Sequence, residues 1–370
     1  MQAVIHKELR ETVKKGKERK LTLHSVRETI SGKTLENPAW KGLIYFFRDL
    51  LVFGCILTAI VSTDRIYFLI PLWILAGFSI SSLFIIGHDA AHGALFKSKR
   101  LAWWIGQTAL LPSLHAYEQW SYGHNRIHHG HTIKLEGDFV WRPLSPAQYA
   151  DLSLGKKMLH RLYWSFLGAG PYYLIDIWLK GMVLFTAPSR GARRDKVLML
   201  FFALASSAAL VYAGGLSKAG FDTLSGIWFW SKMALFPFLA FNYFIGFSVY
   251  VHHIGETISW KKQSDWTPFH GQMNGTINYH VPAPVNFFMH NIFIHMPHHV
   301  NMRIPFYNLP RALSEIKAEY GEYVIERKSM FRDYLTATGK CKLFDPETGK
   351  WLKYSKTKSM ELRVLKPDQV

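Results

Sequence analysis

Histidine is concentrated in a few short segments of this chain of 370 residues. Twelve of the eighteen histidines fall in four segments, all of them within or beside apolar stretches. Neutral imidazole is a common ligand for iron, copper and zinc. Because the chain has only two cysteines, the sequence predicts a metal site whose ligands are nitrogen alone or nitrogen with oxygen. The segments are GHDAAHGALF (His88, His92), WSYGHNRIHHGHT (His124, His128, His129, His131), VYVHHIGET (His252, His253) and MHNIFIHMPHHV (His290, His295, His298, His299).

Two of these segments have spacings that place histidines on one face of a helix. His88 and His92 are four residues apart, so both side chains can point at one metal ion. His295, His298 and His299 are related by three and four residues and also share a face. Both segments therefore favour ligand roles for these side chains.

The second segment fits a regular helix less well. His124, His128 and His131 fall on one stripe, whereas His129 points about 100° further round than His128. Either the helix is locally distorted, or His128 and His129 bind different metals. The segments together offer more imidazoles than one ion can use, which favours two metals. Structural zinc sites need four ligands and usually include cysteine.

Apolar segments of about the length needed to cross a bilayer must position these histidines. They form two tight hairpins, which predicts four membrane spans. The chain is also rich in aromatic residues, with 13 Trp, 26 Phe and 17 Tyr, and carries a formal charge of +18. No basic helix or zinc module accompanies that charge, so no nucleic-acid partner is expected. The expected spans are 42–61 with 66–86, and 197–215 with 226–251.

Basic residues set the expected orientation. The segment 189–196 is read as a basic loop, and it belongs with both termini on the cytoplasmic side. This arrangement brings all four histidine segments toward one face. Residues 101–114 are too short to span and are expected to be re-entrant or interfacial, and residues 162–185 are expected to form an interfacial helix. The chain divides into a basic cytosolic tail (1–40), a membrane domain (41–316) and a cytosolic C-terminal tail (317–370).

The ordered histidine boxes HxxxH, HxxxHH and HxxHH resemble those of the membrane fatty acid desaturases, an integral-membrane di-iron family. The similarity is greatest to acyl-lipid omega-6 (delta-12-type) desaturases of cyanobacteria and plastids. It covers residues 84–313 and includes DFVWRP, QMNGT and IPFYNLPRA. The implied fold is all-α, with about four transmembrane helices in two hairpins, interfacial helices and a cytosolic histidine-rich di-iron cap.

The resemblance also implies a ligand set for two iron ions. His253 matches an extra histidine that the family carries before the third box, with His252 where glutamine is common. Many relatives have two residues rather than three between the first histidines of the second box, so the extra residue here would rotate His124 relative to His128. The implied ligands are His88, His92, His124, His128, His129, His253, His295, His298 and His299.

Five further residues are candidates for supporting roles. His131 and His290 match histidines of similar chains and are either ligands or hydrogen-bonding partners of ligands. His252 is an alternative to His253. Asp89 is expected to hydrogen-bond a ligand imidazole or to cap a helix. Asn274 could contact metal-bound water or form a turn in NGT.

The implied activity is oxygen-dependent dehydrogenation of a membrane-lipid acyl chain, which leaves a cis double bond. Dioxygen is the co-substrate, and no catalytic side chain is expected beyond the metal centre. No haem, flavin or nicotinamide motif is present, so electrons must come from a separate carrier, and the basic surface suits an acidic ferredoxin. The implied location is a bacterial inner membrane.

Two other functions remain open on the sequence. A fatty acyl hydroxylase or related di-iron oxygenase would use the same scaffold and the same first hydrogen abstraction. A membrane metal-binding or transport protein would place its ligands near the bilayer midplane, whereas these histidines lie at span ends and in loops.

Overall fold

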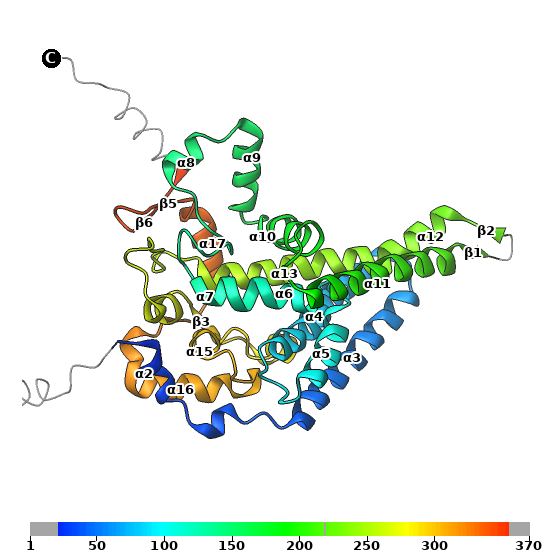
Figure 1. The fold of residues 1–370 in the computed structure, drawn as a ribbon. Helices are drawn as coiled ribbons and strands as arrows, with labels where there is room; N and C mark the ends of the chain where they lie inside the picture. The colour runs from blue at the N-terminus through cyan, green and yellow to red at the C-terminus, as the bar shows by residue number, and fades with distance from the viewer. Residues whose placement is uncertain (1–20, 218–219, 355–370) are drawn as a thin grey trace, which may run out of the picture.

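The described part of the computed structural model, residues 21–217 and 220–354, is mainly helical, with a bundle of long rods meeting a more irregular cap (Figure 1). Four helical rods are long and apolar enough to cross a membrane. This confirms the predicted all-α membrane fold with two hairpins. The rods are α3 (Ala39–Val61), α4 (Ile66–Ala91), α11 (Arg190–Gly215) and a composite rod, 223–253, of α12 (Thr223–Trp230), the π-helix η4 (Ser231–Leu235) and α13 (Phe236–His253).

The four rods differ in how much protein surrounds them. Over the most apolar 18 residues of each rod, 67% of α4 and 44% of the composite rod are buried inside the protein. The corresponding shares are 17% for α3 and 6% for α11. The inner pair, α4 and α13, packs closely because Gly77 faces Ala240, where a Cβ would come within 2.7 Å. Small residues allow such close approach between membrane helices. Both inner helices end in histidines, so the packing brings two of the histidine segments together.

A buried lysine links the two hairpins at the end away from the histidines. The Lys232 side chain is 3% exposed, and its Nζ donates to Asp64 Oδ1 at 2.7 Å and to the Thr63 carbonyl at 3.1 Å. Lys232 lies in the π-helix of the composite rod, and Thr63 and Asp64 lie in the turn of the first hairpin. The contact fixes the turn of the first hairpin against the second hairpin.

Two predicted segments have different boundaries in the structure. The residues expected as a basic loop, 189–196, are the start of α11, because the Ser189 hydroxyl accepts from the Ala192 N–H and caps the helix. The interfacial segment 162–185 is interrupted at 164–168, between α9 (Leu154–Tyr163) and α10 (Ala169–Tyr172), which continues into the π-helix η3 (Tyr173–Leu184).

Short helices carry the other histidine segments and connect them to the rods. The segment expected as interfacial, 101–114, is largely the amphipathic helix α5 (Lys99–Leu110). The second histidine segment runs through α6 (Tyr117–Ser121), the π-helix η2 (Tyr122–His128) and α7 (His129–His131). Others are α8 (Pro146–Ala150), η5 (His270–Asn274), α14 (Ala283–Met289), α15 (His295–Val300), η6 (Phe306–Asn308) and α16 (Leu309–Tyr320).

The C-terminal segment assigned to a tail is folded as far as residue 354. Tyr334 and Phe344 are each 1% exposed, and the Tyr334 hydroxyl donates to the Phe166 carbonyl at 2.6 Å. The segment therefore packs against the membrane domain, and its cytosolic placement stays a prediction. Its elements are η7 (Gly321–Tyr323), β4 (Glu326–Arg327), α17 (Met330–Lys340), β5 (Leu343–Asp345) and β6 (Lys350–Leu352).

The strands form three two-stranded pairs. β3 (Asn278–Tyr279) pairs in parallel with β4, β1 (Leu216–Ser217) pairs antiparallel with β2 (Gly220–Phe221), and β5 pairs antiparallel with β6. The N-terminal segment α2 (Leu23–Glu28) and η1 (Gly32–Leu35) joins the cap, where Arg27 Nε donates to the Val300 carbonyl at 2.6 Å. Of the predicted N-terminal tail, residues 1–20 lie outside the described part.

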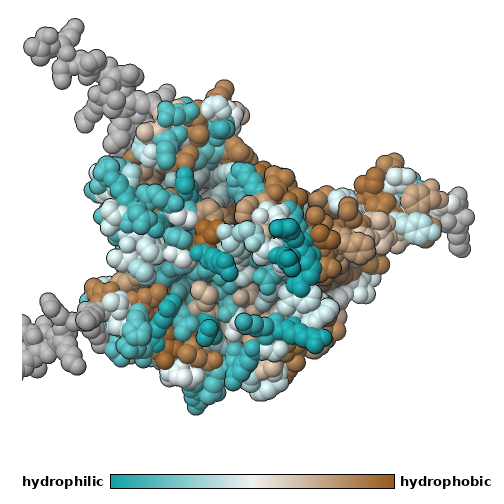
Figure 2. Space-filling view, viewed as in Figure 1, coloured by the Kyte–Doolittle hydropathy of each residue, from teal (hydrophilic) through white to brown (hydrophobic). Residues whose placement is uncertain are grey.

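Surface hydropathy separates the rods from the cap. In Figure 2 brown surface covers the rods around α11 and α12, and teal predominates over the cap. Many side chains of α3 and α11 are large, apolar and exposed, including Phe47, Leu51, Phe201 and Leu204. An exposed apolar band of this extent is expected where lipid surrounds the protein.

Candidate metal centre

The structure brings the nine predicted ligand histidines together in two adjoining groups. The first group is built by His88 and His92 at the end of α4, His124 on η2 and His298 on α15, whose candidate ligand atoms all lie within 4.8 Å of one another. His129 joins this group, because its Nε2 lies 3.1 Å from the Nε2 atoms of both His124 and His298. Four of these five side chains are buried, and His124 is nearly so.

The second group lies between the end of α13 and the third box. His128, His253 and His299 have their candidate ligand atoms within 4.8 Å of one another. His295 Nε2 approaches the Nε2 atoms of His253 at 3.2 Å and His299 at 3.0 Å. His129 of the first group stacks on His299 of the second, with ring centroids 4.2 Å apart. The two groups therefore contact each other directly through stacked imidazole rings.

The nitrogen spacing fits ligands gathered around metal ions. A metal–imidazole bond of about 2.1 Å places two ligands of one ion about 3.0 to 3.4 Å apart, for angles between about 90° and 109°. The closest Nε2 pairs are 3.0 to 3.2 Å apart, within that range. Both ring nitrogens of His92 are buried and have no hydrogen-bond partner among the described residues. Burying a polar group without a partner is costly, so a ligand role accounts for this ring.

A local change of helix type resolves the irregular spacing of the second box. Residues 122–128 form a π-helix, which accommodates one more residue per hydrogen-bonded turn than an α-helix. His124 therefore stays in the first group despite the extra residue before His128. The adjacent His128 and His129 enter different groups, so the helix is locally distorted, and binding of different metals by the two residues stays a prediction.

The predicted role of Asp89 has a structural counterpart. The His88 Nδ1–H donates to Asp89 Oδ1 at 2.8 Å, which turns Nε2 toward the first group. The other carboxylate oxygen accepts from the Phe306 N–H at 2.8 Å. Asp89 thus orients the predicted ligand His88 and joins the first box to the segment that follows the third.

Three supporting contacts were not predicted. The His128 Nδ1–H donates to both carboxylate oxygens of Asp138 at 3.1 Å, and His299 Nδ1 lies 2.8 Å from Gln272 Oε1. His253 Nδ1 lies 3.0 Å from the Gly275 carbonyl. These contacts occupy Nδ1 and leave Nε2 facing the second group. Asp138 lies in DFVWRP and Gln272 in QMNGT, two of the segments that resemble the desaturases. The resemblance pointed to these segments but implied no role for either residue.

The structure places two of the five supporting candidates, both histidines, outside both groups. His131 Nδ1 lies 3.0 Å from the Ile127 carbonyl, and its ring stacks near Trp266. His290 Nε2 lies 2.6 Å from Asp49 Oδ2 and 2.9 Å from Ser82 Oγ. These contacts account for both rings without a metal.

The two remaining candidates differ in their distance from the centre. Asn274 Nδ2 donates to the Tyr323 carbonyl at 3.4 Å, away from the groups. His252 stacks on His295 with ring centroids 3.8 Å apart and an interplanar angle of 15°. It therefore supports a ligand through ring packing, whereas His253 is the member of the pair that joins the second group.

Burial keeps the cap imidazoles in their neutral form. The pKa values of His124, His129, His298 and His299 are well below the usual value, first because burial disfavours the charged ring and then because neighbouring imidazoles repel a second charge. A neutral ring has a lone pair available for a metal. These four rings therefore do not need to lose protons near neutral pH before they bind a cation.

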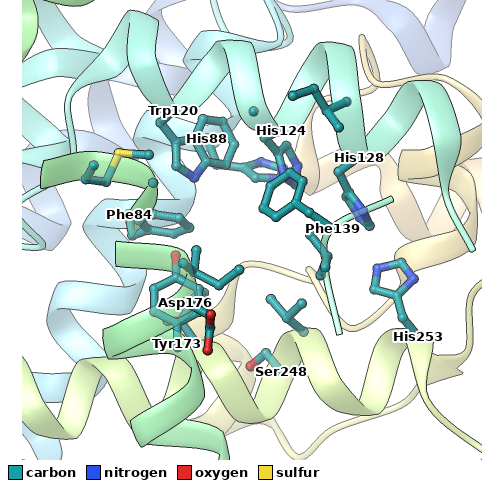
Figure 3. Close-up of a pocket in the computed structure, with 18 of the residues that line it drawn as sticks. Phe84, His88, Trp120, His124, His128, Phe139, Tyr173, Asp176, Ser248 and His253 are labelled. Atoms are coloured by element: carbon teal, nitrogen blue, oxygen red, sulfur yellow. The ribbon is translucent and has the colours of Figure 1, made fainter. Parts of the chain in front are cut away.

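A largely apolar cavity of about 390 Å³ lies against the histidines (Figure 3). Six histidines form part of its wall, five of them predicted ligands and the sixth His252, and aromatic and aliphatic side chains form most of the rest. In Figure 3 His88, His124 and His128 line the cavity opposite Tyr173 and Ser248, with Phe84 at one end and His253 at the other. Exposed Lys180 and Phe185 lie on the side where the cavity meets the surface. The cavity can hold an apolar chain next to both groups.

The fold and site define a membrane protein that holds a buried polyhistidine centre at the ends of its spanning helices. Residues 66–330 match the fatty acid desaturase family, and this match covers most of the chain. The chain therefore belongs to the fatty acid desaturase family and is an oxidoreductase of that family.

Named relatives are similar over most of the chain. An sn-1 oleoyl-lipid 12-desaturase from Picosynechococcus sp. is 27% identical over 88% of this chain and 91% of its own length. An sn-1 acyl-lipid omega-3 desaturase (ferredoxin) from Nostoc sp. is 30% identical over 91% of this chain and 92% of its own. A chloroplastic omega-6 fatty acid desaturase from Glycine max is 30% identical over 76% of this chain and 64% of its own.

Proposed function

We propose that this chain is an oxygen-dependent acyl-lipid desaturase of the delta-12/omega-6 type, which introduces a cis double bond into a membrane-lipid acyl chain. The observation that carries the proposal is the apolar cavity with both histidine groups in one wall. The names of the cyanobacterial and plastid relatives support the substrate class and the position of the double bond.

Two iron ions are the proposed cofactors, one for each histidine group. The first ion would be held by His88, His92, His124, His129 and His298, and the second by His128, His253, His295 and His299. Imidazole suits iron, although the donor set alone does not exclude other transition metals. When bound, the irons supply the redox chemistry that activates dioxygen, the proposed co-substrate.

The remaining task of the chain is to position the substrate and exclude water. Phe84, Ile245 and Val249 give the cavity apolar walls that bind a methylene chain by removing it from water. Asp89 and Asp138 keep Nε2 of their histidines directed inward. No acid–base side chain is needed, since the two hydrogens leave from carbon and the oxygen atoms end in water.

The electron donor and the location are proposed on similar grounds. A ferredoxin-like carrier fits the basic charge of the chain and the name of the Nostoc relative. The proposed location is the inner membrane of a bacterial cell, with both termini cytoplasmic. The basic residues at the start of α11 support this orientation.

The test is to express the chain in a host whose lipids have one defined double bond per acyl chain. Double bonds in the products are then mapped by mass spectrometry. We expect a second cis double bond and the loss of two hydrogens. A gain of one oxygen would instead identify a hydroxylase. Protein that contains zinc without iron, and that forms no oxygen-dependent product, would refute an oxygen-activating function.

A further inference from the structure

A second cleft lies next to the histidine centre and is separate from the apolar cavity. It has a volume of about 520 Å³ and lies where the chain leaves α13. Three of its lining residues are 2 to 3% exposed and form its floor: Ile254, Ile277 and Tyr279. Arg327, Lys328 and Arg332 also line it, and they come from β4, the following turn and α17. The cleft shares no lining residue with the apolar cavity.

The rim of this cleft has an excess of positive charge. Arg327, Lys328 and Arg332 are exposed and form no ion pair with another described residue. The two carboxylates of the cleft already have partners. Glu256 pairs with Lys340 at 2.9 Å, and Asp333 accepts from the Tyr279 hydroxyl at 3.1 Å.

The neighbouring acid is also paired. Glu326, next to Arg327, accepts from Lys317 and lies 3.0 Å from His280 Nε2. The three cations on the rim are therefore available to a negatively charged partner.

The floor of the cleft is one layer of residues away from the second histidine group. Ile254 directly follows His253, and the Ile277 N–H donates to the His252 carbonyl at 2.9 Å. The His252 ring in turn stacks on His295 at 3.8 Å. Backbone, one hydrogen bond and a ring stack thus connect the floor to the proposed metal ligands.

We propose that an acidic one-electron carrier protein of the iron–sulfur class docks on this cleft and passes electrons to the centre across its floor. The inference rests on the proposed function, which requires two electrons for each double bond. One –CH2–CH2– unit, one O2, two electrons and two protons give one –CH=CH– unit and two waters. The carrier therefore docks twice per turnover. Because the cleft and the apolar cavity share no lining residue, lipid and carrier can bind at the same time.

The test reverses the charge of the rim with R327E/K328E/R332E and compares two assays. In steady state with an acidic [2Fe–2S] ferredoxin, we expect the KM for ferredoxin to rise about tenfold or more, because rim charges mainly govern encounter. In the second assay the enzyme is reduced chemically without oxygen, freed of excess reductant and mixed with oxygen and lipid. This single turnover bypasses docking, so we expect its yield to equal that of the unmodified protein.

A matched control reverses three exposed cations elsewhere on the cap, with K97E/K99E/R100E. We expect the KM for ferredoxin in this variant to stay within about twofold of the original. An equal rise in both variants would overturn the assignment, because it would show a general charge effect. Unchanged KM in the cleft variant would overturn it as well.

The single-turnover assay also separates the two proposals. If the unmodified, reduced protein forms no double bond, the proposed desaturase function fails. If it does, only the docking site is under test. A milder variant, R327Q/K328Q/R332Q, removes the charges with less risk of misfolding. A full single-turnover yield together with a raised KM for ferredoxin supports the docking site. Loss of the single-turnover yield contradicts the docking site.

Discussion

At the scale of single residues, the most informative pair is His128 and His129, which are adjacent in sequence but belong to different groups. The candidate ligand atoms of His128 lie near those of His253 and His299, and Nε2 of His129 lies near those of His124 and His298. The chain backbone thereby joins the two proposed metal sites directly. Loss of one ligand is therefore expected to affect one site first.

His298→Ala is expected to remove the first proposed iron. The ring contributes to the first group and touches His129 at 3.1 Å, so its loss leaves a gap in that ligand set. We expect iron content to fall from about two to about one per chain and desaturation to be abolished, while membrane insertion is retained. The measurements are elemental analysis of purified protein and lipid product analysis. His131→Ala is the matched control, and desaturation retained by His298→Ala would refute the site assignment.

Asp138→Asn tests a positioning residue. The carboxylate accepts from His128 Nδ1–H and also from the N–H groups of Ile133 and Val140. Loss of such a partner typically costs about 10- to 100-fold in metal affinity or activity. We expect a drop of that size in iron affinity, measured by chelator competition. Asp138→Glu should recover part of it, and an unchanged affinity in Asp138→Asn would contradict the role.

The sequence predicted all nine candidate ligand positions, but it did not predict Asp138 and Gln272, which hydrogen-bond to candidate ligands. Candidate ligand histidines can be recognised in a sequence by residue type and spacing. The structure brings all nine predicted positions together. Their coordination of metal stays a prediction. Asp138 is ten residues from His128, and Gln272 is 27 residues from His299, so no helical period connects either pair. Only the folded loops bring these partners into contact.

At the scale of elements, the π-helix η2 allows the second box to have one extra residue and still place its histidines in the two groups. It places His124 in the first group although three residues separate His124 from His128. The sequence raised a local distortion as one alternative. It could not identify a π-turn, because the i→i+5 bonds depend on packing of the whole segment.

Deleting Arg126 is expected to convert η2 to a regular α-helix without loss of the centre. The deletion restores the two-residue spacing found in many similar chains, and a π-turn is relieved by removing its extra residue. We expect iron content to stay within about twofold of the original, measured on purified protein. Deleting both Ala90 and Ala91 is the matched control. It leaves His88 and His92 two residues apart, about 160° around the axis of α4, and should abolish iron binding. Equal loss in both deletions would contradict the π-turn explanation.

At the scale of the whole molecule, hairpin topology explains why distant segments meet. α4 and α13 are both second helices of their hairpins, so both return to the side where α3 and α11 begin. Their terminal histidines therefore lie at one end of the bundle. This convergence was predictable from span count and turn length.

The fold of residues 317–354 was not predictable in the same way. Its mixed charges suggested a tail, yet the apolar faces of α16 and α17 bury Ile316, Tyr320 and Tyr334. The signal was present in that spacing, but short amphipathic helices only become stable when the cap offers a surface to pack on.

The proposed orientation can be tested with single cysteines on opposite sides of the bundle. Both native cysteines are first replaced, with Cys55→Ser and Cys341→Ala. Exposed Ser62, in the turn of the first hairpin, and exposed Lys350, in the cap, are then changed to cysteine one at a time. Because basic residues favour the cytoplasmic side, the cap with the start of α11 should face the cytoplasm. A membrane-impermeant maleimide should label Ser62→Cys in intact spheroplasts and Lys350→Cys only after lysis. The reverse pattern would place the histidine centre on the outer face, out of reach of a cytoplasmic electron carrier.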